Sequence, residues 1–390
     1  MKRIILVIID SVGIGAMPDA ERFGDFGVDT FGNIYKTFPD MKIDNLKQLG
    51  VGKIDGVDYI DYNGSIIGSY GKMKELSNGK DTTTGHWEIA GLHIEQPFKT
   101  YPEGFPDRVI KKFEERTGRK VLCNKPASGT VIIEEFGEEH IKTGKPIVYT
   151  SADSVFQIAA HEDIIPLDEL YSMCRIARDI LMGEDQVARI IARPFIGEKG
   201  KFERTPNRRD FSLSPFGKTI LDELKENKFD VIAVGKIADI FNNQGVTEDV
   251  HIVNNMDGVD QTLRYIKEKN NGLIFTNLVD FDAKFGHRRD VEGYKNAIEK
   301  FDLRIPEMIE AMNEDDILII SADHGNDPTY KGTDHTREMV PLLVYGASIK
   351  RNFNLGIRNS FSDIAATIAD YFRVNNIGNG ISFLDEILED

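Results

Sequence analysis

The chain has 390 residues, of which 48 are Lys or Arg and 64 are Asp or Glu, so its formal net charge is −16. This acidic balance argues against a general nucleic-acid binder, which needs a basic face to displace counterions, but a local pocket can still bind a small anion. At about 150 residues per domain, the length predicts two or three domains, or one large domain with an insertion.

The first predicted element is a buried strand over Arg3–Ile9. Its apolar run stops at Asp10, far short of the ~20 residues that span a bilayer, and no small-residue cleavage site follows closely. The only two cysteines, Cys123 and Cys174, cannot form a disulfide framework or a Cys-rich zinc site. These features predict a cytoplasmic protein without a membrane segment.

A polar segment, Gly79-Lys80-Asp81-Thr82-Thr83-Thr84-Gly85, leads into a helical pattern that contains the only Trp. The ordinary interpretation is a helix N-cap followed by several threonines. A helix N-terminus also favours an anion, and beside divalent metal a Thr hydroxyl can lose its proton and become a nucleophile for phosphoryl transfer. Composition alone does not choose among the three threonines.

The middle of the chain, residues 101–215, forms a pattern of its own. We expect helices over Glu103–Arg116 and Leu167–Leu181, strands over Ile147–Tyr149 and Arg189–Ala192, and loops rich in Arg, Lys, Ser and Thr. Because sheet-forming segments lie on both sides, this region is predicted to be an inserted cap domain. The catalytic core would then comprise residues 1–100 and 216–390, and active sites often lie between such domains.

After the insertion, short β-branched runs alternate with helical spacing. We expect strands over Asp230–Val234, Gly272–Val279, Ile317–Ser321 and Leu342–Tyr345, and helices over Pro215–Glu226, Met256–Lys269 and Val291–Met312, with a last helix capped by Ser362 and ending at Phe372. Strands that are apolar on both faces are typical of parallel sheets covered by helices. The alternation therefore predicts an open α/β sheet.

Carboxylates and imidazoles follow three of these strands. The residues concerned are Asp10, Asp282, His287, Asp323, His324 and His335. In open parallel sheets, ligands bind at the carboxyl ends of the strands, and this mixture of ligands suits a divalent ion such as Mn²⁺ or Zn²⁺. Each Asp alone would be an ordinary cap or turn residue, but convergence from three strand ends favours a metal site with enough ligands for two ions.

Five segments together resemble the prokaryotic phosphopentomutases, a family of the alkaline phosphatase superfamily. They are 10–15 (DSVGIG), 79–88 (GKDTTTGHWE), 124–130 (NKPASGT), 282–290 (DAKFGHRRD) and 323–327 (DHGND). The resemblance extends over essentially the whole chain. It implies an alkaline-phosphatase-like core, with a mostly parallel sheet flanked by helices, and an inserted smaller α/β cap domain.

The resemblance also implies roles for individual residues. One Mn²⁺ would be bound by Asp10, Asp323 and His324, and a second by Asp282, His287 and His335. Thr82 matches the phosphorylated threonine of the family and would bridge both ions. In the cap, Asp153 would accept a hydrogen bond from a ribose hydroxyl. The candidates for binding the substrate phosphate are Arg189, Arg193, Arg204 and Lys236.

By the same resemblance, the chain would interconvert α-D-ribose 1-phosphate and D-ribose 5-phosphate, and their 2-deoxy counterparts, in nucleoside catabolism. The route would use a phosphothreonine enzyme and a pentose 1,5-bisphosphate, with a sugar bisphosphate as the priming activator. The alternatives are a related metal-dependent phosphatase or phosphoglycerate mutase, and a sugar-phosphate-binding protein without turnover. The expected partners are small pentose phosphates, and no oligomeric state is predicted.

Overall fold

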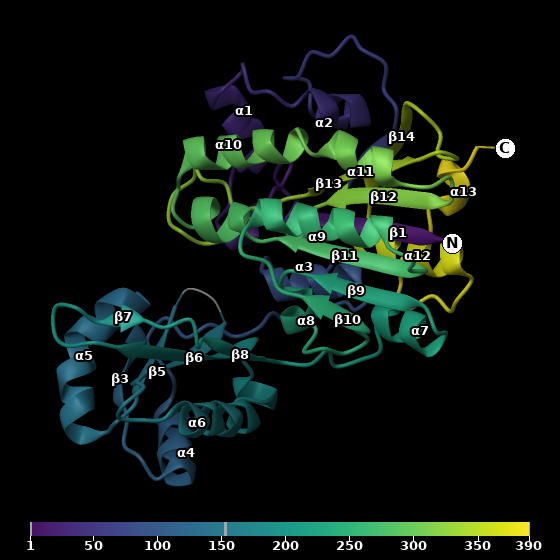
Figure 1. The fold of residues 1–390 in the computed structure, drawn as a ribbon. Helices are drawn as coiled ribbons and strands as arrows, with labels where there is room; N and C mark the ends of the chain where they lie inside the picture. The colour runs from purple at the N-terminus through teal and green to yellow at the C-terminus, as the bar shows by residue number, and fades with distance from the viewer. Residues whose placement is uncertain (1, 152–153, 390) are drawn as a thin grey trace. The chain divides into compact units, whose positions relative to one another are not determined.

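The computed structural model describes residues 2–151 and 154–389. It consists of two compact units: Met1–Pro97 with Pro215–Asp390, called unit 1, and Phe98–Ser214, called unit 2 (Figure 1). Each unit has its own sheet and its own buried apolar core. Asp153, one of the predicted substrate contacts, lies outside the described residues.

Unit 1 is built on an eight-stranded sheet with β1 near its centre, and all seven residues of β1 are buried. The order across the sheet is β10 (Glu248–Val250), β9 (Asp230–Val234), β11 (Gly272–Leu278), β1 (Arg3–Ile9), β12 (Asp316–Ser321), β13 (Val340–Gly346), β2 (Ser69–Met73) and β14 (Phe353–Arg358). The first five of these strands are mutually parallel, as a covered α/β sheet requires.

One predicted strand has the wrong direction. The run Leu342–Tyr345 lies in β13, which is antiparallel to both β12 and β2, and only the last pair, β2 with β14, is parallel again. An antiparallel edge on an otherwise parallel sheet is common. The predicted mostly parallel sheet is therefore confirmed.

Helices cover the sheet of unit 1 in two groups (Figure 1). One group comprises α9 (Asn255–Lys267), α10 (Val291–Asp302) and α11 (Ile305–Ala311), and the other comprises α3 (Thr82–Ile89), α7 (Ile220–Glu226) and α12 (Ser362–Phe372). Shorter helices are α1 (Thr30–Thr37), α2 (Asp44–Leu49), α8 (Ile237–Ile240) and α13 (Leu384–Ile387). This covering explains why the central strands are apolar on both faces.

Three predicted helices have different boundaries because of local chemistry. The expected helix Val291–Met312 is two helices, and Pro306 lies in the first turn of the second, where its missing N–H costs nothing. Pro106 precedes α4, so that helix starts at Asp107 rather than Glu103. The expected Pro215–Glu226 helix starts after Thr219, whose capping box fixes α7.

The predicted capping role of Ser362 is also wrong. Ser362 is the first residue of α12, and its N–H donates to the Ser360 hydroxyl at 3.0 Å. Its own hydroxyl donates to the carbonyl of Glu88 instead. Ser362 therefore ties α12 to α3, the helix that begins with Thr82.

Unit 2 has a six-stranded mixed sheet. Its strands are β3 (Leu122–Pro126), β4 (Ile147–Thr150), β5 (Val155–His161), β6 (Arg189–Ile196), β7 (Glu203–Arg204) and β8 (Arg209–Ser212), and its helices are α4 (Asp107–Thr117), α5 (Gly129–Thr143) and α6 (Leu167–Ile180). Helices α4 and α6 bury one face of this sheet, whose apolar core includes Phe113 and Phe156.

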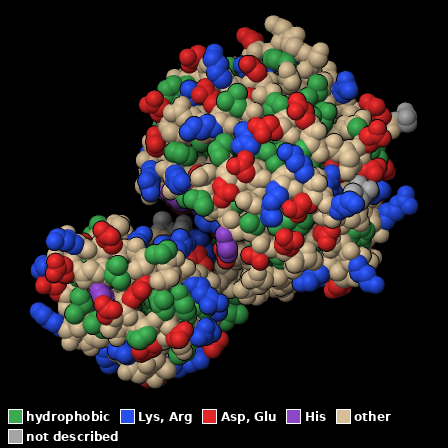
Figure 2. Space-filling model, in the orientation of Figure 1, with side chains coloured by type: hydrophobic (Ala, Val, Ile, Leu, Met, Phe, Trp, Pro, Cys, Tyr) green, Lys and Arg blue, Asp and Glu red, His purple; other side chains and the backbone are tan. Residues whose placement is uncertain are grey.

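On the face of unit 1 that Figure 2 shows, acidic and basic side chains are interspersed, which is typical of a solvated surface. Among the described residues, no helix combines the length and the apolar character needed to cross a membrane.

Candidate metal centre

The carboxyl ends of three adjacent strands bring the predicted ligands together. The registers pair Ile9 of β1 with Leu278 of β11, and Ile8 of β1 with Ser321 of β12, so the three strands end at the same edge of the sheet. Asp10 follows β1, whereas Asp323 and His324 follow β12. Residues far apart in the sequence therefore share one edge.

Asp282 lies in a single turn of π-helix, Phe281–Gly286, that follows β11, and His287 is the residue directly after this turn. The His287 N–H donates to the Asp282 carbonyl at 3.0 Å, an i to i+5 bond. The wide turn places His287 Nε2 3.1 Å from Asp282 Oδ2. Such single-turn π segments are frequent at functional sites.

All six predicted ligands lie in one cluster. His324 Nε2 is 3.3 Å from Asp323 Oδ2 and 3.6 Å from Asp10 Oδ1. His335 Nε2 is 3.3 Å from Asp282 Oδ1 and 3.1 Å from His287 Nε2. Five of the six are buried, and only His287 is half-buried.

Two groups of three within this cluster have their ligand atoms within 4.8 Å of one another. They are Asp10, Asp323 and His324, and Asp282, His324 and His335. His324 thus belongs to both groups, while His287 contacts the second through Asp282 and His335. The assignment of His287 rather than His324 to the second ion stays a prediction.

The electrostatics of the cluster fit a divalent cation. Within the described part of the chain, Asp10 Oδ1 and Asp323 Oδ2 are buried without a hydrogen-bond partner. Burial, together with the charges of Asp323 and Asp282, raises the pKa of Asp10 from 3.8 to about 7. Burying carboxylates without partners costs several kcal/mol, and a cation bound by these oxygens and the neighbouring imidazoles removes that cost.

His324 holds the compensating charge when no metal is bound. Burial lowers its pKa, but the carboxylates of Asp323 and Asp10 outweigh that effect and raise the pKa to about 9. Conversely, His335 and His287 hold the pKa of Asp282 well below its usual range despite burial. The site therefore contains ligands that must release protons before a cation can bind them.

Thr82 is the threonine that contacts the cluster. It is the first residue of α3, and its hydroxyl lies 3.2 Å from His324 Nε2. The carboxylate of Asp81 caps this helix by accepting from the N–H groups of Thr83 and Thr84, and also from the Thr84 hydroxyl. The local sequence thus fixes the first turn and leaves the Thr82 hydroxyl facing the metal ligands.

The sequence analysis missed the residues that hold these ligands in place. Asn326 donates to Asp282 Oδ1 at 2.7 Å and accepts from Arg289 at 2.5 Å. Arg289, in the left-handed region at φ 54°, also donates to the carbonyls of Gly332 and Asp334, next to His335. In the sequence, the position of Asn326 directly after Asp-His-Gly could have indicated that it supports the ligands.

In unit 2, the structure brings two of the predicted phosphate-binding arginines together. Arg193 on β6 and Arg204 on β7 both lie near the buried Tyr149, and a Cβ at Gly129 would come within 3 Å of the Arg204 guanidinium. Burial and the neighbouring Arg208 lower the pKa of Arg193 to about 10. Closely spaced cations at the start of α5 are suited to an anion.

The other two predicted cations lie elsewhere. Arg189, at the start of β6, has its guanidinium 3.8 Å from the Asp210 carboxylate. Lys236 belongs to unit 1, where it precedes α8 after β9. The structure therefore does not gather all four of these residues within one unit.

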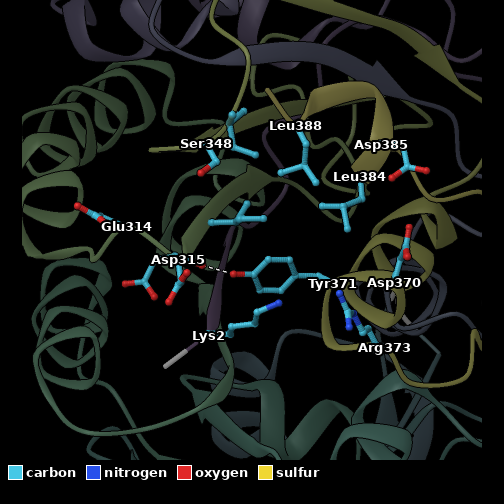
Figure 3. Close-up of a pocket in the computed structure, with 13 residues that line it drawn as sticks. Lys2, Glu314, Asp315, Ser348, Asp370, Tyr371, Arg373, Leu384, Asp385 and Leu388 are labelled. Carbon is cyan, nitrogen blue, oxygen red and sulfur yellow. Dashed lines mark hydrogen bonds between the residues drawn. The ribbon is translucent and has the colours of Figure 1, made fainter. Parts of the chain in front are cut away.

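A cavity of about 360 Å³ in unit 1 contains none of the predicted site residues (Figure 3). Its wall includes Lys2, Asp315, Tyr371 and Arg373, and the Tyr371 hydroxyl donates to the Asp315 carbonyl. Lys2 and Asp315 adjoin the amino ends of β1 and β12. Its charged lining residues are mostly acidic, which does not suit a phosphate, and none of the predicted histidine ligands reaches it.

Comparisons with known proteins place the chain. A family model of the metalloenzyme superfamily matches residues 2–376. The phosphopentomutase of Clostridioides difficile (strain 630) is 61% identical over 389 residues, covering 99% of this chain and 100% of the relative. That of Alkaliphilus oremlandii (strain OhILAs) is also 61% identical and covers 100% of both chains. Among solved structures, the PH0037 protein of Pyrococcus horikoshii has 15% identity, a TM-score of 0.49, and coverage of 97% of this chain and 99% of its own.

Proposed function

This chain belongs to the phosphopentomutase family of the metalloenzyme superfamily, and we propose that it transfers phosphoryl groups between the C1 and C5 oxygens of a pentose through Thr82. It is an isomerase with an alkaline-phosphatase-like fold. One observation carries the proposed mechanism: the hydroxyl of Thr82 lies 3.2 Å from His324, which belongs to the cluster of six candidate metal ligands.

The proposed cofactor is a pair of Mn²⁺ ions. Asp10, Asp323 and His324 would hold one ion, and Asp282, His287 and His335 the other, and Thr82 would contribute its hydroxyl oxygen as a further ligand. When bound, the ions lower the pKa of the Thr82 hydroxyl and oppose negative charge on the transferred group. Asn326 and Arg289 orient Asp282 for this task through the hydrogen bonds described above.

In the first step, phospho-Thr82 donates its phosphoryl group to the C5 hydroxyl oxygen of ribose 1-phosphate. The P–O bond to Thr82 breaks as the bond to O5 forms, and the proton of that hydroxyl replaces the phosphoryl group on Thr82 Oγ1, which gives a pentose 1,5-bisphosphate. After the bisphosphate reorients, Thr82 Oγ1 attacks the phosphorus on O1. Ribose 5-phosphate leaves with a hydroxyl at C1, and Thr82 is phosphorylated again. A sugar bisphosphate would prime resting enzyme by supplying the first phosphoryl group, and 2-deoxyribose phosphates would follow the same route.

The phosphate that is not transferred needs its own cationic site. We assign it to Arg193 and Arg204, with Arg189 and Lys236 as further candidates and Asp153 as acceptor of a ribose hydroxyl. Guanidinium groups bind phosphate bidentately. In this proposal residues 101–215 act as the cap, and excluding water there would favour transfer to the sugar over hydrolysis. Pentose phosphates as substrates and the cysteine content fit a cytoplasmic enzyme.

Thr82→Ala tests the covalent step, with Thr82→Ser as the matched control that keeps a hydroxyl. After incubation with Mn²⁺ and a sugar bisphosphate, we expect the intact mass of wild type to rise by one phosphoryl group and that of Thr82→Ala to stay unchanged. Thr82→Ala should also form no ribose 5-phosphate from ribose 1-phosphate. Near-wild-type turnover by Thr82→Ala would refute the phosphothreonine, and release of inorganic phosphate without isomer would favour a phosphatase.

A further inference from the structure

His86 is a fully buried histidine on α3, one turn after Thr82, and the sequence assigned it no role. Its Nδ1 lies 2.9 Å from the carbonyl oxygen of Thr82. Because a carbonyl oxygen can only accept, Nδ1 must carry the proton of the imidazole. The side chain therefore folds back along its own helix and holds the peptide of Thr82.

The other ring nitrogen of His86 faces an asparagine in the middle of the sheet. Asn277 Nδ2 is 3.4 Å from His86 Nε2 and donates to Asp10 Oδ2 at 2.7 Å. When Asp10 is ionised its carboxylate can only accept, which sets the orientation of the Asn277 amide and leaves the second hydrogen of Nδ2 available to His86 Nε2. Asn277 is fully buried within β11, where an apolar residue would otherwise be expected.

The same ring also adjoins the second strand end of the metal cluster. His86 Nδ1 is also 3.1 Å from Asp323 Oδ2, so the imidazole adjoins this carboxylate as well as the Thr82 carbonyl. Phe275 stacks on the ring, with centroids 5.8 Å apart and planes at 28°. The imidazole thus lies fixed between Thr82, Asp10 and Asp323.

We propose that His86 is a positioning residue whose two nitrogens have separate tasks. Nδ1–H holds the Thr82 peptide, and therefore the nucleophile, in place. Nε2 orients the Asn277 amide, which in turn holds Asp10 in the geometry that binds metal. Outer partners of metal ligands commonly act in this way. The first task rests on the proposed role of Thr82, whereas the second depends only on the metal ligands.

Two substitutions separate the tasks, because Asn reproduces the Nδ1 position of histidine and Gln reproduces its Nε2 position. His86→Asn keeps the donor to Thr82 but loses the contact with Asn277, so we expect the Kd for Mn²⁺, titrated calorimetrically into metal-free protein, to rise at least about tenfold. His86→Gln keeps an acceptor for Asn277, so its Mn²⁺ affinity should stay within about threefold of wild type while kcat falls at least tenfold at unchanged KM.

His93→Asn is the matched control, since His93 also contacts a backbone carbonyl, that of Leu76 at 3.2 Å, but lies outside the cluster. It should leave both quantities unchanged. Asn277→Leu, which removes both donors, should weaken Mn²⁺ binding as His86→Asn does and provides a second route if one variant fails to fold, as judged by thermal unfolding in EDTA. Equal effects of His86→Asn and His86→Gln on both quantities, or no effect of either, would overturn the proposal. If the Thr82→Ala enzyme were active, only the first task of His86 would be refuted. The effect of His86→Asn on the affinity for Mn²⁺ would still test the second task.

Discussion

The paired strands β1 and β12 have buried charged side chains at both ends, but these charges are compensated differently at the two ends. At the amino end, Arg3 and Asp316 form a buried bidentate pair, with bonds of 2.9 and 2.5 Å. At the carboxyl end, Asp10 and Asp323 are equally buried, but each keeps an oxygen that no protein donor satisfies within the described residues. The protein completes the first arrangement itself, whereas the second leaves two carboxylate oxygens for the proposed cation.

This comparison teaches how to separate structural from functional buried charge. Asp316 at the amino end and Asp10 and Asp323 at the carboxyl end are all nearly inaccessible to solvent, so burial alone does not distinguish the two ends. The two ends differ in how the buried charge is compensated. Removing one partner of a satisfied ion pair leaves the other charge uncompensated. Removing one of three clustered carboxylates, such as Asp10, relieves the repulsion among them. The predictions below test that difference.

The largest effect is expected for Asp10→Asn, because burial and the charges of Asp323 and Asp282 already disfavour the ionised Asp10 carboxylate in the metal-free protein. Losing one unit of negative charge from the metal cluster weakens the binding of the cation, which supplies several kcal/mol of transition-state stabilisation, so turnover should fall about a thousandfold or more. The metal-free protein should unfold at the same temperature as wild type or at a higher one. Formation of ribose 5-phosphate and thermal unfolding in EDTA measure the two quantities. A marked loss of metal-free stability would contradict the comparison.

Asp316→Asn should show the reverse pattern. It leaves Arg3 buried without its charge partner, so we expect a loss of about 3–5 kcal/mol in the free energy of unfolding, with kcat of the folded enzyme within about twofold of wild type. Urea unfolding and the rate at saturating substrate test this. The double variant Arg3→Met with Asp316→Leu should recover much of the loss, because a well-packed apolar pair can replace a buried ion pair.

Metal binding should depend on pH through Asp10 and His324. Each must release a proton to act as a ligand, so between about pH 7 and 9 only His324 is still protonated and log K for Mn²⁺ should rise with pH at a slope near one. Below about pH 7 the slope should approach two. Calorimetric titrations at several pH values give these slopes, and Asp10→Asn should remove the steeper part. A slope near one at all pH values would disprove the role of Asp10.

The same shifts determine how the metal-free protein responds to pH. The folded-state pKa values of Asp10 and His324 are both raised above the values of 3.8 and 6.5. The folded chain therefore binds more protons than the unfolded chain, and this contribution to stability is lost as pH rises through about 7 and then 9. In EDTA, the thermal midpoint should fall between pH 6 and 9, and saturating Mn²⁺ should reverse that trend.

The smallest effect concerns helix capping. Asp81→Ala removes the cap of α3 and Asn254→Ala removes that of α9, each of which accepts from two backbone N–H groups. Both should lower stability by about 1 kcal/mol. Only Asp81→Ala should also lower turnover, because α3 carries Thr82. Equal turnover in the two variants would show that the first turn of α3 needs no cap to position Thr82.

Much of the fold followed from local patterns. The bounds of β1 and β9 match the predicted runs because each run is apolar after its first residue and stops at a polar or glycine residue. Strands β2 and β14 were missed because their sequences, SYGKM and FNLGIR, contain glycine and polar residues typical of sheet edges. The continuous spacing through Pro306 hid the break between α10 and α11.

Only part of the candidate site could be predicted from the sequence. Aspartate after a strand and the Asp-His-Gly turn marked the ligands, because parallel strands bring their carboxyl ends together. The choice of Thr82 over its neighbours depends on which hydroxyl faces His324, which is set by the helix start. His86 and Asn277 are 191 residues apart, and nothing near either of them in the sequence indicates the contact.

The central place of β1 in the sheet has a consequence for synthesis on the ribosome. β1 emerges first, but its neighbours β11 and β12 begin only at Gly272 and Asp316. At roughly 5–20 residues per second, its apolar side chains wait tens of seconds for their partners, whereas unit 2 is already complete by Ser214. Nascent chains arrested before residue 272 should therefore contain a protease-resistant unit 2 and a β1 segment that proteases still digest.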